Sequence, residues 1–291
     1  MGILSRLFGS KKNIRKREGN PDVYYMPNED ERINWGIEKA KLTLDYFKDC
    51  LNEPKEGQDY FSVKARIEDE GKVEHIWLSE PSFDEEGNIY GVIGNEPIDV
   101  TNVKIGEKVG ITFDYVSDWM IIEKGRLIGG YTIRAIRDGV PENQLADFDN
   151  SLGGMIVDEG EDYFPVNYET PEGALLSLEK AYDNDDLEAA INAKSFNKEA
   201  EFMLKKRVDF EIDDDLIKQT AEVLELGFIK EMKENGMPKF TNIRRAFKRQ
   251  MISDEHCIVT EICVYPDGGK SIQKLSTYKV NNQWKVVALE E

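Results

Sequence analysis

Histidine is the side chain best suited to acid–base chemistry near neutral pH, and the chain contains two. His75 lies in the strand-like run 74–77, and with Asp118 to orient its ring it could act as a general base. No nucleophile is recognisable beside it, so we favour a structural polar network around the neighbouring tryptophans. His256 begins a strand-like run in which packing is favoured over catalysis. We therefore predict no catalytic residue.

Several residues of the first half combine polar groups with aromatic rings, which is the composition of a ligand pocket. The same composition suits a sheet corner where glycine permits a bulge and tryptophan fills a small core, and both interpretations stay open. We expect these residues, apart from Asn95 and Arg134, to line one shared polar-aromatic centre. The candidate binding residues are Glu74, His75, Trp77, Asn95, Asp118, Trp119, Tyr131 and Arg134.

Cysteine and acidic residues show no metal-binding pattern. The chain has three cysteines, and Cys257 and Cys263 lie in one expected strand, roughly 20 Å apart, too far for a disulfide. The carboxylate clusters at 183–186 and 213–215 precede expected helices, where anions complement the helix dipole, and they lack the spacing of a calcium loop. No glycine-rich phosphate loop is recognisable. We predict no metal, no cofactor and a reducing compartment.

The net charge of −19 and the pI of about 4.7 argue against binding to nucleic acid or anionic lipid, because both need exposed lysine and arginine. The acidity suits a basic protein partner, although it can also serve solubility alone. One basic stretch, 244–249, lies on an expected strand. Alternation sends Arg245 and Arg249 to one face and Arg244 and Lys248 to the other. We expect these cations to form ion pairs with the surrounding acids.

No stretch approaches the roughly 20 apolar residues that a membrane span needs, and residues 1–12 are too short and too charged for a signal peptide. We predict a cytoplasmic protein without integral membrane association. Residues 1–27 are assigned as a basic tail, because six cations stand against Glu18 within residues 1–18. An interfacial membrane anchor is the alternative. A frayed tail is favoured, since one short apolar turn buries too little area.

Apolar periodicity defines the elements of a first domain over residues 28–140. Helical spacing predicts a helix over 28–52, capped by Asn28 with Glu31 in the capping-box position. Alternating residues then predict short strands, so this domain should be a helix on a small, mostly antiparallel sheet. The strands are expected at 61–67, 73–78, 89–93, 110–116, 119–123 and 127–136.

An acidic stretch without lysine or arginine covers residues 138–163, and we assign 141–167 as an interdomain linker. The second domain, 168–291, opens with the helix-start pair Thr170-Pro171. Further helices precede expected strands at 239–251, 255–265, 270–280 and 283–289. This order predicts a cone of helices on a curved four-stranded antiparallel sheet, and hence an α+β protein of two domains. The strand 255–265 is apolar on both faces, which a homodimer through this sheet would cover.

Several fragments of the first domain carry a family resemblance. They are Phe61-Ser-Val-Lys-Ala, Glu74-His-Ile-Trp77-Leu, Gly91 through Asn95-Glu-Pro97, Ser117-Asp118-Trp119-Met120, and Gly129-Gly130-Tyr131-Thr132 with Arg134. Over about residues 33–140 the domain resembles the YegJ-like bacterial family of unknown function. The resemblance implies no known activity.

The second domain ends on Tyr278-Lys-Val followed by Gln283-Trp284-Lys-Val-Val287. With its helices first, it is similar to the nuclear-transport-factor-two-like cone, and 172–176, 185–190 and 196–204 resemble the bacterial immunity proteins of that group. The resemblance implies a non-enzymatic inhibitor that binds a bacterial toxin, for which a basic toxin suits the acidic charge. The alternative is an enzyme or small-ligand-binding protein with a pocket in the cone or in the polar-aromatic centre.

Overall fold

The computed structural model describes residues 14–15, 23–24, 31–207 and 212–290. The chain divides into two compact units, residues 1–160 and 161–291, which are described one at a time. In the expected basic tail, β1 (Ile14–Arg15) pairs with β2 (Val23–Tyr24) in antiparallel fashion. The rest of that tail and the expected cap at Asn28 lie outside the described residues.

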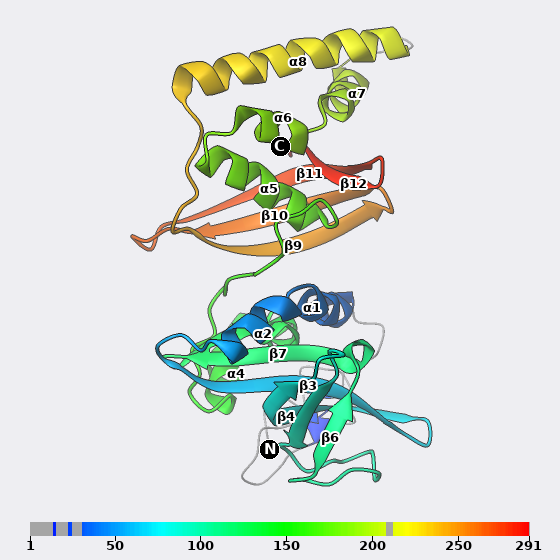
Figure 1. The fold of residues 1–291 in the computed structure, drawn as a ribbon, viewed down its shortest axis with the longest axis vertical. Helices are drawn as coiled ribbons and strands as arrows, with labels where there is room; N and C mark the ends of the chain where they lie inside the picture. Colours follow the sequence, from blue (N-terminus) through cyan, green and yellow to red (C-terminus); the bar gives the residue numbers. More distant parts are fainter. Residues whose placement is uncertain (1–13, 16–22, 25–30, 208–211, 291) are drawn as a thin grey trace. The chain divides into compact units, whose positions relative to one another are not determined.

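The first unit is built on a six-stranded sheet in which every neighbouring pair is antiparallel (Figure 1). The long hairpin strands lie at its centre, and shorter strands lie at its edges. In spatial order the strands are β6 (Lys108–Ile111), β5 (Ile89–Ile93), β4 (Lys72–Phe83), β3 (Gln58–Asp69), β7 (Val116–Glu123) and β8 (Arg126–Gly129).

Two helices, α1 (Glu31–Leu42) and α2 (Leu44–Asn52), stand where one helix over 28–52 was predicted. The break falls at Thr43, whose buried hydroxyl donates to the Lys39 carbonyl at 2.8 Å and accepts from Trp119 Nε1 at 3.1 Å. The tryptophan thus binds the chain where the two helices meet. Phe47 of α2 is fully buried and packs against Trp119 at a ring-centroid distance of 5.5 Å.

The predicted strand 127–136 is wrong beyond Gly129. The strand ends at Gly129, and helix α3 (Tyr131–Arg137) begins two residues later. Gly129 and Gly130 both have left-handed φ angles, of 69° and 61°, which glycine adopts at little cost. This pair turns the chain out of β8 and directly into the helix. The predicted strand 110–116 also ends early, at Ile111, and is followed by the 3-10 turn η2 (Phe113–Tyr115).

Much of the expected linker is folded into the first unit. The segment contains the 3-10 turn η3 (Glu142–Gln144) and helix α4 (Leu145–Ser151), and Ile156 forms a parallel bridge with Arg126 at the edge of β8. The segment was assigned as a linker because of its acidic residues, but it also contains widely spaced apolar residues. Of these, Val157 is buried against Met120 and Leu127, with Leu152 and Met155 beside it.

The second unit places its helices before its strands, and the helices cover one face of a four-stranded antiparallel sheet (Figure 1). The predicted α+β class is confirmed. Side chains cap three of the helices, with Thr170 at α5, Asp186 at α6 and Asp213 at α8. The elements are α5 (Pro171–Asp183), α6 (Leu187–Ala193), α7 (Phe196–Arg207), α8 (Asp214–Asn235), β9 (Arg244–Ser253), β10 (His256–Val264), β11 (Lys270–Val280) and β12 (Gln283–Leu289), with the strands in the order β12-β11-β10-β9.

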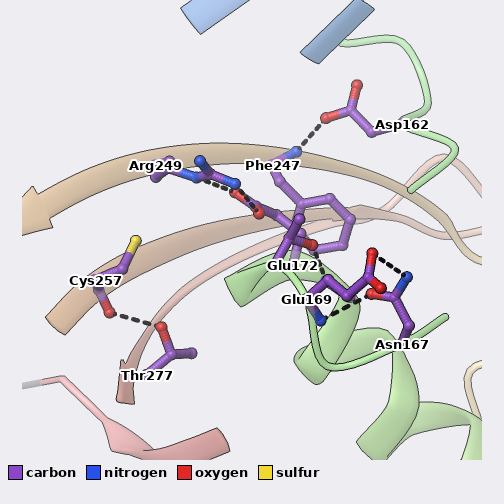
Figure 2. Close-up of polar contacts among 10 residues, drawn as sticks. Asp162, Asn167, Glu169, Glu172, Phe247, Arg249, Cys257 and Thr277 are labelled. Carbon is purple, nitrogen blue, oxygen red and sulfur yellow. Dashed lines mark hydrogen bonds and ion pairs between the residues drawn. The ribbon is translucent and has the colours of Figure 1, made fainter. Parts of the chain in front are cut away.

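Strand β9 forms an edge of this sheet, and Asp162 covers the first half of that edge. The Asp162 N–H donates to the Arg245 carbonyl at 2.8 Å, and its carboxylate accepts from the Phe247 N–H at 2.7 Å (Figure 2). Phe164 packs edge-on against the buried Phe247 ring, with 5.9 Å between centroids. The entry segment of the unit therefore acts in place of a further strand.

None of the helices in the described ranges is both long and apolar enough to cross a membrane. All three cysteines are buried free thiols, and burial raises the pKa of Cys257 and of Cys263 to about 12. Across the same ranges, no three His, Cys, Asp or Glu side chains are grouped so that they could hold a metal ion.

Candidate functional site

A row of polar and aromatic side chains crosses the central strands of the first unit. Lys64 of β3 is the cross-strand neighbour of Trp77 on β4 and of Asp118 on β7. The Lys64 ammonium lies 5.4 Å from the centre of the Trp77 ring and 3.4 Å from Thr132 Oγ1. Burial lowers the pKa of Lys64, and the Asp118 charge opposes that shift.

Asp118 is fully buried, and its carboxylate accepts four hydrogen bonds. Oδ1 accepts from the N–H groups of Trp119 at 2.9 Å and Tyr131 at 3.0 Å, and Oδ2 accepts from Thr132 N–H at 2.8 Å and Thr132 Oγ1 at 2.6 Å. Burial raises the pKa of Asp118, while the Thr132 hydroxyl and Lys64 act in the opposite direction. This carboxylate therefore satisfies the first N–H groups of α3, as helix capping requires.

The general-base hypothesis required His75 to pair with Asp118. In the structure, His75 is paired with Ser117 instead. Its Nδ1 lies 2.6 Å from Ser117 Oγ. Burial lowers the pKa of His75 to about 4, with Lys64 and Arg66 adding to the effect, so the ring is neutral at pH 7. Sequence reasoning missed Ser117 as its partner, because a register shift in the β3–β7 pairing changes which side chains meet there. Ser117 is only 1 % exposed, which keeps its hydroxyl from meeting a substrate directly.

Trp77 and Trp119 were expected to share one polar-aromatic centre, but they do not. Trp77 is opposite Lys64, whereas Trp119 is opposite Val63, the preceding residue of β3, so the two rings lie on opposite faces of the sheet. Trp119 belongs to the core under α1 and α2, and its ring packs edge-on against Tyr131 at 5.5 Å. The predicted centre is thus two separate environments.

The remaining candidate residues secure backbone segments. Glu74 Oε2 accepts from three successive N–H groups of the loop 98–100, at 2.8, 2.9 and 3.4 Å. Asn95 Oδ1 accepts from the Trp77 N–H at 3.3 Å. Arg134 donates to the carbonyl of Gly129 at 2.8 Å and to the carbonyls of residues 127 and 158. These contacts fix the loops around the polar row.

The interior of the second unit holds ion pairs between α5 and β9. Glu172 is fully buried and accepts from Arg249 Nε at 2.9 Å and Nη2 at 2.6 Å (Figure 2), and Glu179 pairs with Arg245. Seven helical residues span about 10 Å, and four strand residues span about 13 Å, so the two spacings match. The expected shared face of Arg245 and Arg249 and their ion pairing are confirmed.

A third buried carboxyl, that of Glu261 on β10, lies beside Glu179. Gln273 donates to Glu261 Oε2, and Oε1 of both glutamates is buried without a hydrogen-bond donor. Burial and the Glu261 carboxyl raise the pKa of Glu179 to about 10, against the effect of Arg245. This raised pKa keeps Glu179 protonated at pH 7, which lowers the negative charge of the cluster by one. Buried and partly buried ionisable groups of α5, β9 and β10 are therefore clustered together.

Helix α8 presents a surface of a different kind. Its inner face packs through Ile217, Ala221, Leu224 and Phe228 against α7. On its outer face Val223 and Leu226 are 68 % and 66 % exposed, and i,i+3 residues are neighbours on a helix. Carboxylates outnumber lysines around them: Asp213, Asp214, Asp215, Glu222, Glu225, Glu231 and Glu234 against Lys218, Lys230 and Lys233.

A shallow hollow of about 420 Å³ adjoins the first turns of α8. Its lining combines the apolar residues Ile191, Phe196 and Ala221 with charged groups of both signs, among them Lys218 and Glu222. The hollow extends the α8 surface toward α6 and β12.

The first unit defines a class of small α+β domain, in which α1 and α2 cover a six-stranded antiparallel sheet and a buried aspartate caps α3. Residues 30–155 match the family described as uncharacterized protein conserved in bacteria, DUF2314. The uncharacterized protein YegJ of Escherichia coli K12 is 37% identical over 108 residues, which cover 37% of this chain and 69% of YegJ. The chain belongs to this family, and the resemblance of its first domain is confirmed.

A protein of Neisseria meningitidis serogroup B, named as a candidate ankyrin repeat protein, is 34% identical over 151 residues. The match covers 49% of this chain and 59% of the meningococcal protein, so the chain spans little more than half of that relative. No solved structure matches the chain.

Proposed function

We propose that this protein acts in the cytoplasm by binding a basic protein, without turnover of its own, as an immunity-type inhibitor of a bacterial toxin. The observation that carries the proposal is the α8 surface, where Val223 and Leu226 are 68 % and 66 % exposed among carboxylates. An apolar centre with a charged rim is the usual anatomy of a protein interface.

Charge supports a basic partner in particular. Among the residues that the structure describes, the ion pair involving α8 is Lys230 with Glu234, at 3.9 Å. Most of the helix's carboxylates therefore remain available to a cationic surface. The net charge of −19 adds a long-range attraction, which speeds encounter and selects partners more than it raises affinity.

Two further observations support the same proposal. The order of helices before a curved antiparallel sheet suits the nuclear-transport-factor-two-like cone that the second domain resembles, a group that includes immunity proteins. Repeat proteins such as those with ankyrin repeats offer extended binding surfaces, and the name of the meningococcal relative is consistent with a binding role in this family.

The proposal predicts that a toxin gene adjoins the gene of this protein, and it is tested by measuring association with the product of that gene. The association rate should fall steeply as salt rises from 50 mM, because exposed charges are screened beyond about 8 Å at physiological ionic strength. Replacing Glu222 and Glu225 by lysine, with Leu226→Ser, should weaken binding at least tenfold and abolish rescue of growth on co-expression.

A matched variant separates the α8 surface from net charge. Glu85→Lys with Glu86→Lys changes two exposed acids of the first unit by the same charge, and it should slow association only slightly. Equal losses for both variants, or no binding to the adjacent toxin, would contradict the proposal.

A second candidate function, small-ligand binding by the first unit, is supported by the incompletely satisfied ammonium of Lys64 in the polar row.

A further inference from the structure

We propose that the first unit carries an oxyanion-binding site on one face of its sheet, formed by Lys64, Arg66 and His75, with Ser117 holding the His75 ring, for a small molecule with a phosphate or carboxylate group. The site lies in a different unit from α8 and is independent of the proposed toxin binding.

The sheet register brings these four residues together. Lys64 and Arg66 lie two residues apart on β3 and so project to the same face. Arg66 is the cross-strand neighbour of His75, just as Lys64 is that of Trp77. Ser117 Oγ lies 2.6 Å from His75 Nδ1. The patch thus combines two cations with one neutral imidazole, whose Nε2 is not the nitrogen that Ser117 contacts.

Asp118 and Glu68 balance the charges of Lys64 and Arg66, but they leave hydrogen-bond donors of the two cations unused. Asp118 already accepts four hydrogen bonds from α3 and its own strand. Glu68 pairs with Arg66 toward solvent, where their side chains are 45% and 42% exposed.

The Lys64 ammonium has three donors, and the hydrogen-bond acceptor that the described residues offer it is Thr132 Oγ1, at 3.4 Å. A half-buried cation with so few acceptors is costly. An oxyanion would satisfy its remaining donors.

The titration behaviour of the patch agrees with this geometry. Burial lowers the pKa of Lys64, and burial followed by the charges of Lys64 and Arg66 lowers the pKa of His75. The Lys64 shift describes a desolvated position, and the His75 shift describes one that is both desolvated and positive. A bound anion would oppose both, and arginine and lysine are the usual ligands of phosphate and carboxylate groups.

Histidine NMR of the full chain tests the site, because the chain has two histidines and His256 of the second unit is an internal control. At constant ionic strength, inorganic phosphate and acetate are titrated in separate arms, which distinguish the two oxyanion classes. We expect saturable shifts of the His75 signals with at least one anion, and a rise of at least half a unit in the pKa of His75 at saturation, with His256 unchanged.

Three variants test which side chains are needed for the response of His75 to the anion. Lys64→Met should abolish the response, and Arg66→Gln, at a position whose side chain is 42% exposed, should weaken it severalfold. Lys72→Met, at an exposed lysine of the neighbouring strand β4, should leave it unchanged. Equal shifts of His75 and His256, a linear response in both arms, or an unchanged response in Arg66→Gln would overturn the proposal. None of these outcomes bears on toxin binding by α8.

Discussion

At the scale of single residues, Asp118 connects separate elements of the first unit, a role that no sequence pattern indicated. Its carboxylate joins β7 to the start of α3 through four hydrogen bonds. Thr132, which donates to it at 2.6 Å, also accepts from Lys64 at 3.4 Å. One buried negative charge thus holds a helix start and balances a half-buried cation.

Removing this carboxylate should destabilise the first unit strongly. Asp118→Ala leaves buried N–H groups unsatisfied and Lys64 without a counter-charge, so we expect a loss of about 3 kcal/mol or more in the free energy of unfolding. Urea titration followed by tryptophan fluorescence measures it. Asp59→Ala, at an exposed aspartate of β3, should stay within about 0.5 kcal/mol of wild type, and similar losses for both variants would refute the role assigned to Asp118.

Glu179 should make the stability of the second unit depend on pH. Its pKa is about 10 in the folded protein, above the ordinary value of 4.5, because of burial and the Glu261 carboxyl. Its contribution to stability is therefore complete below pH 4.5 and is lost progressively as the pH rises toward 10. We expect Glu179→Gln to flatten the alkaline fall of the unfolding free energy between pH 6 and 9. Glu188→Gln, at an exposed position on α6, should keep the wild-type slope.

At the scale of elements, the turn from β8 into α3 depends on close packing as well as on backbone conformation. A Cβ at Gly129 would lie 2.5 Å from the Trp119 ring and from the Trp119 carbonyl. Gly125, in the preceding turn, has a similar φ of 79° but open space around it. The two glycines therefore separate the cost of a left-handed conformation from the cost of a clash.

Alanine at these positions should give clearly different losses. Gly125→Ala should cost only about 1–2 kcal/mol for the left-handed backbone. Gly129→Ala adds a collision with a buried ring and backbone, and we expect an additional loss of at least about 2 kcal/mol. Thermal unfolding of the two variants measures the difference. Equal losses would show that Trp119 moves freely.

Elements that are encoded locally were predictable from the sequence. Apart from the later parts of the predicted strands 110–116 and 127–136, alternation located the strands of both sheets, and the cap at Thr170 starts α5 as expected. The helix α3 was missed because its first N–H groups are satisfied by Asp118, 13 residues earlier in the chain, and a distant partner leaves no local pattern. Ser117 and the α5 glutamates were missed for the same reason, since their roles depend on neighbours that only the folded sheet supplies.

At the scale of the whole molecule, two units with separate cores carry the chain's net charge of −19. The boundary falls between residues 160 and 161, inside the expected linker 141–167. Phe148 and Val157, which are 1 % and 8 % exposed, protect most of the expected linker from local unfolding.

Limited proteolysis should therefore yield first products near residues 1–160 and 161–291. Glu159 is exposed beside this boundary, and cleavage by a glutamate-specific protease, followed by mass spectrometry, identifies the cut. Early cleavage within α4 would show that the acidic segment is a linker after all.

The covering of β9 by Asp162 has a practical consequence for expressing the second unit alone. A fragment that begins at Pro165 would lose both Asp162 and Phe164, and with them the bonds to the backbone of residues 245 and 247. An uncovered edge strand is a template for pairing between chains. A shortened fragment should therefore be prone to aggregation, whereas one beginning at Glu161 keeps its own edge protected.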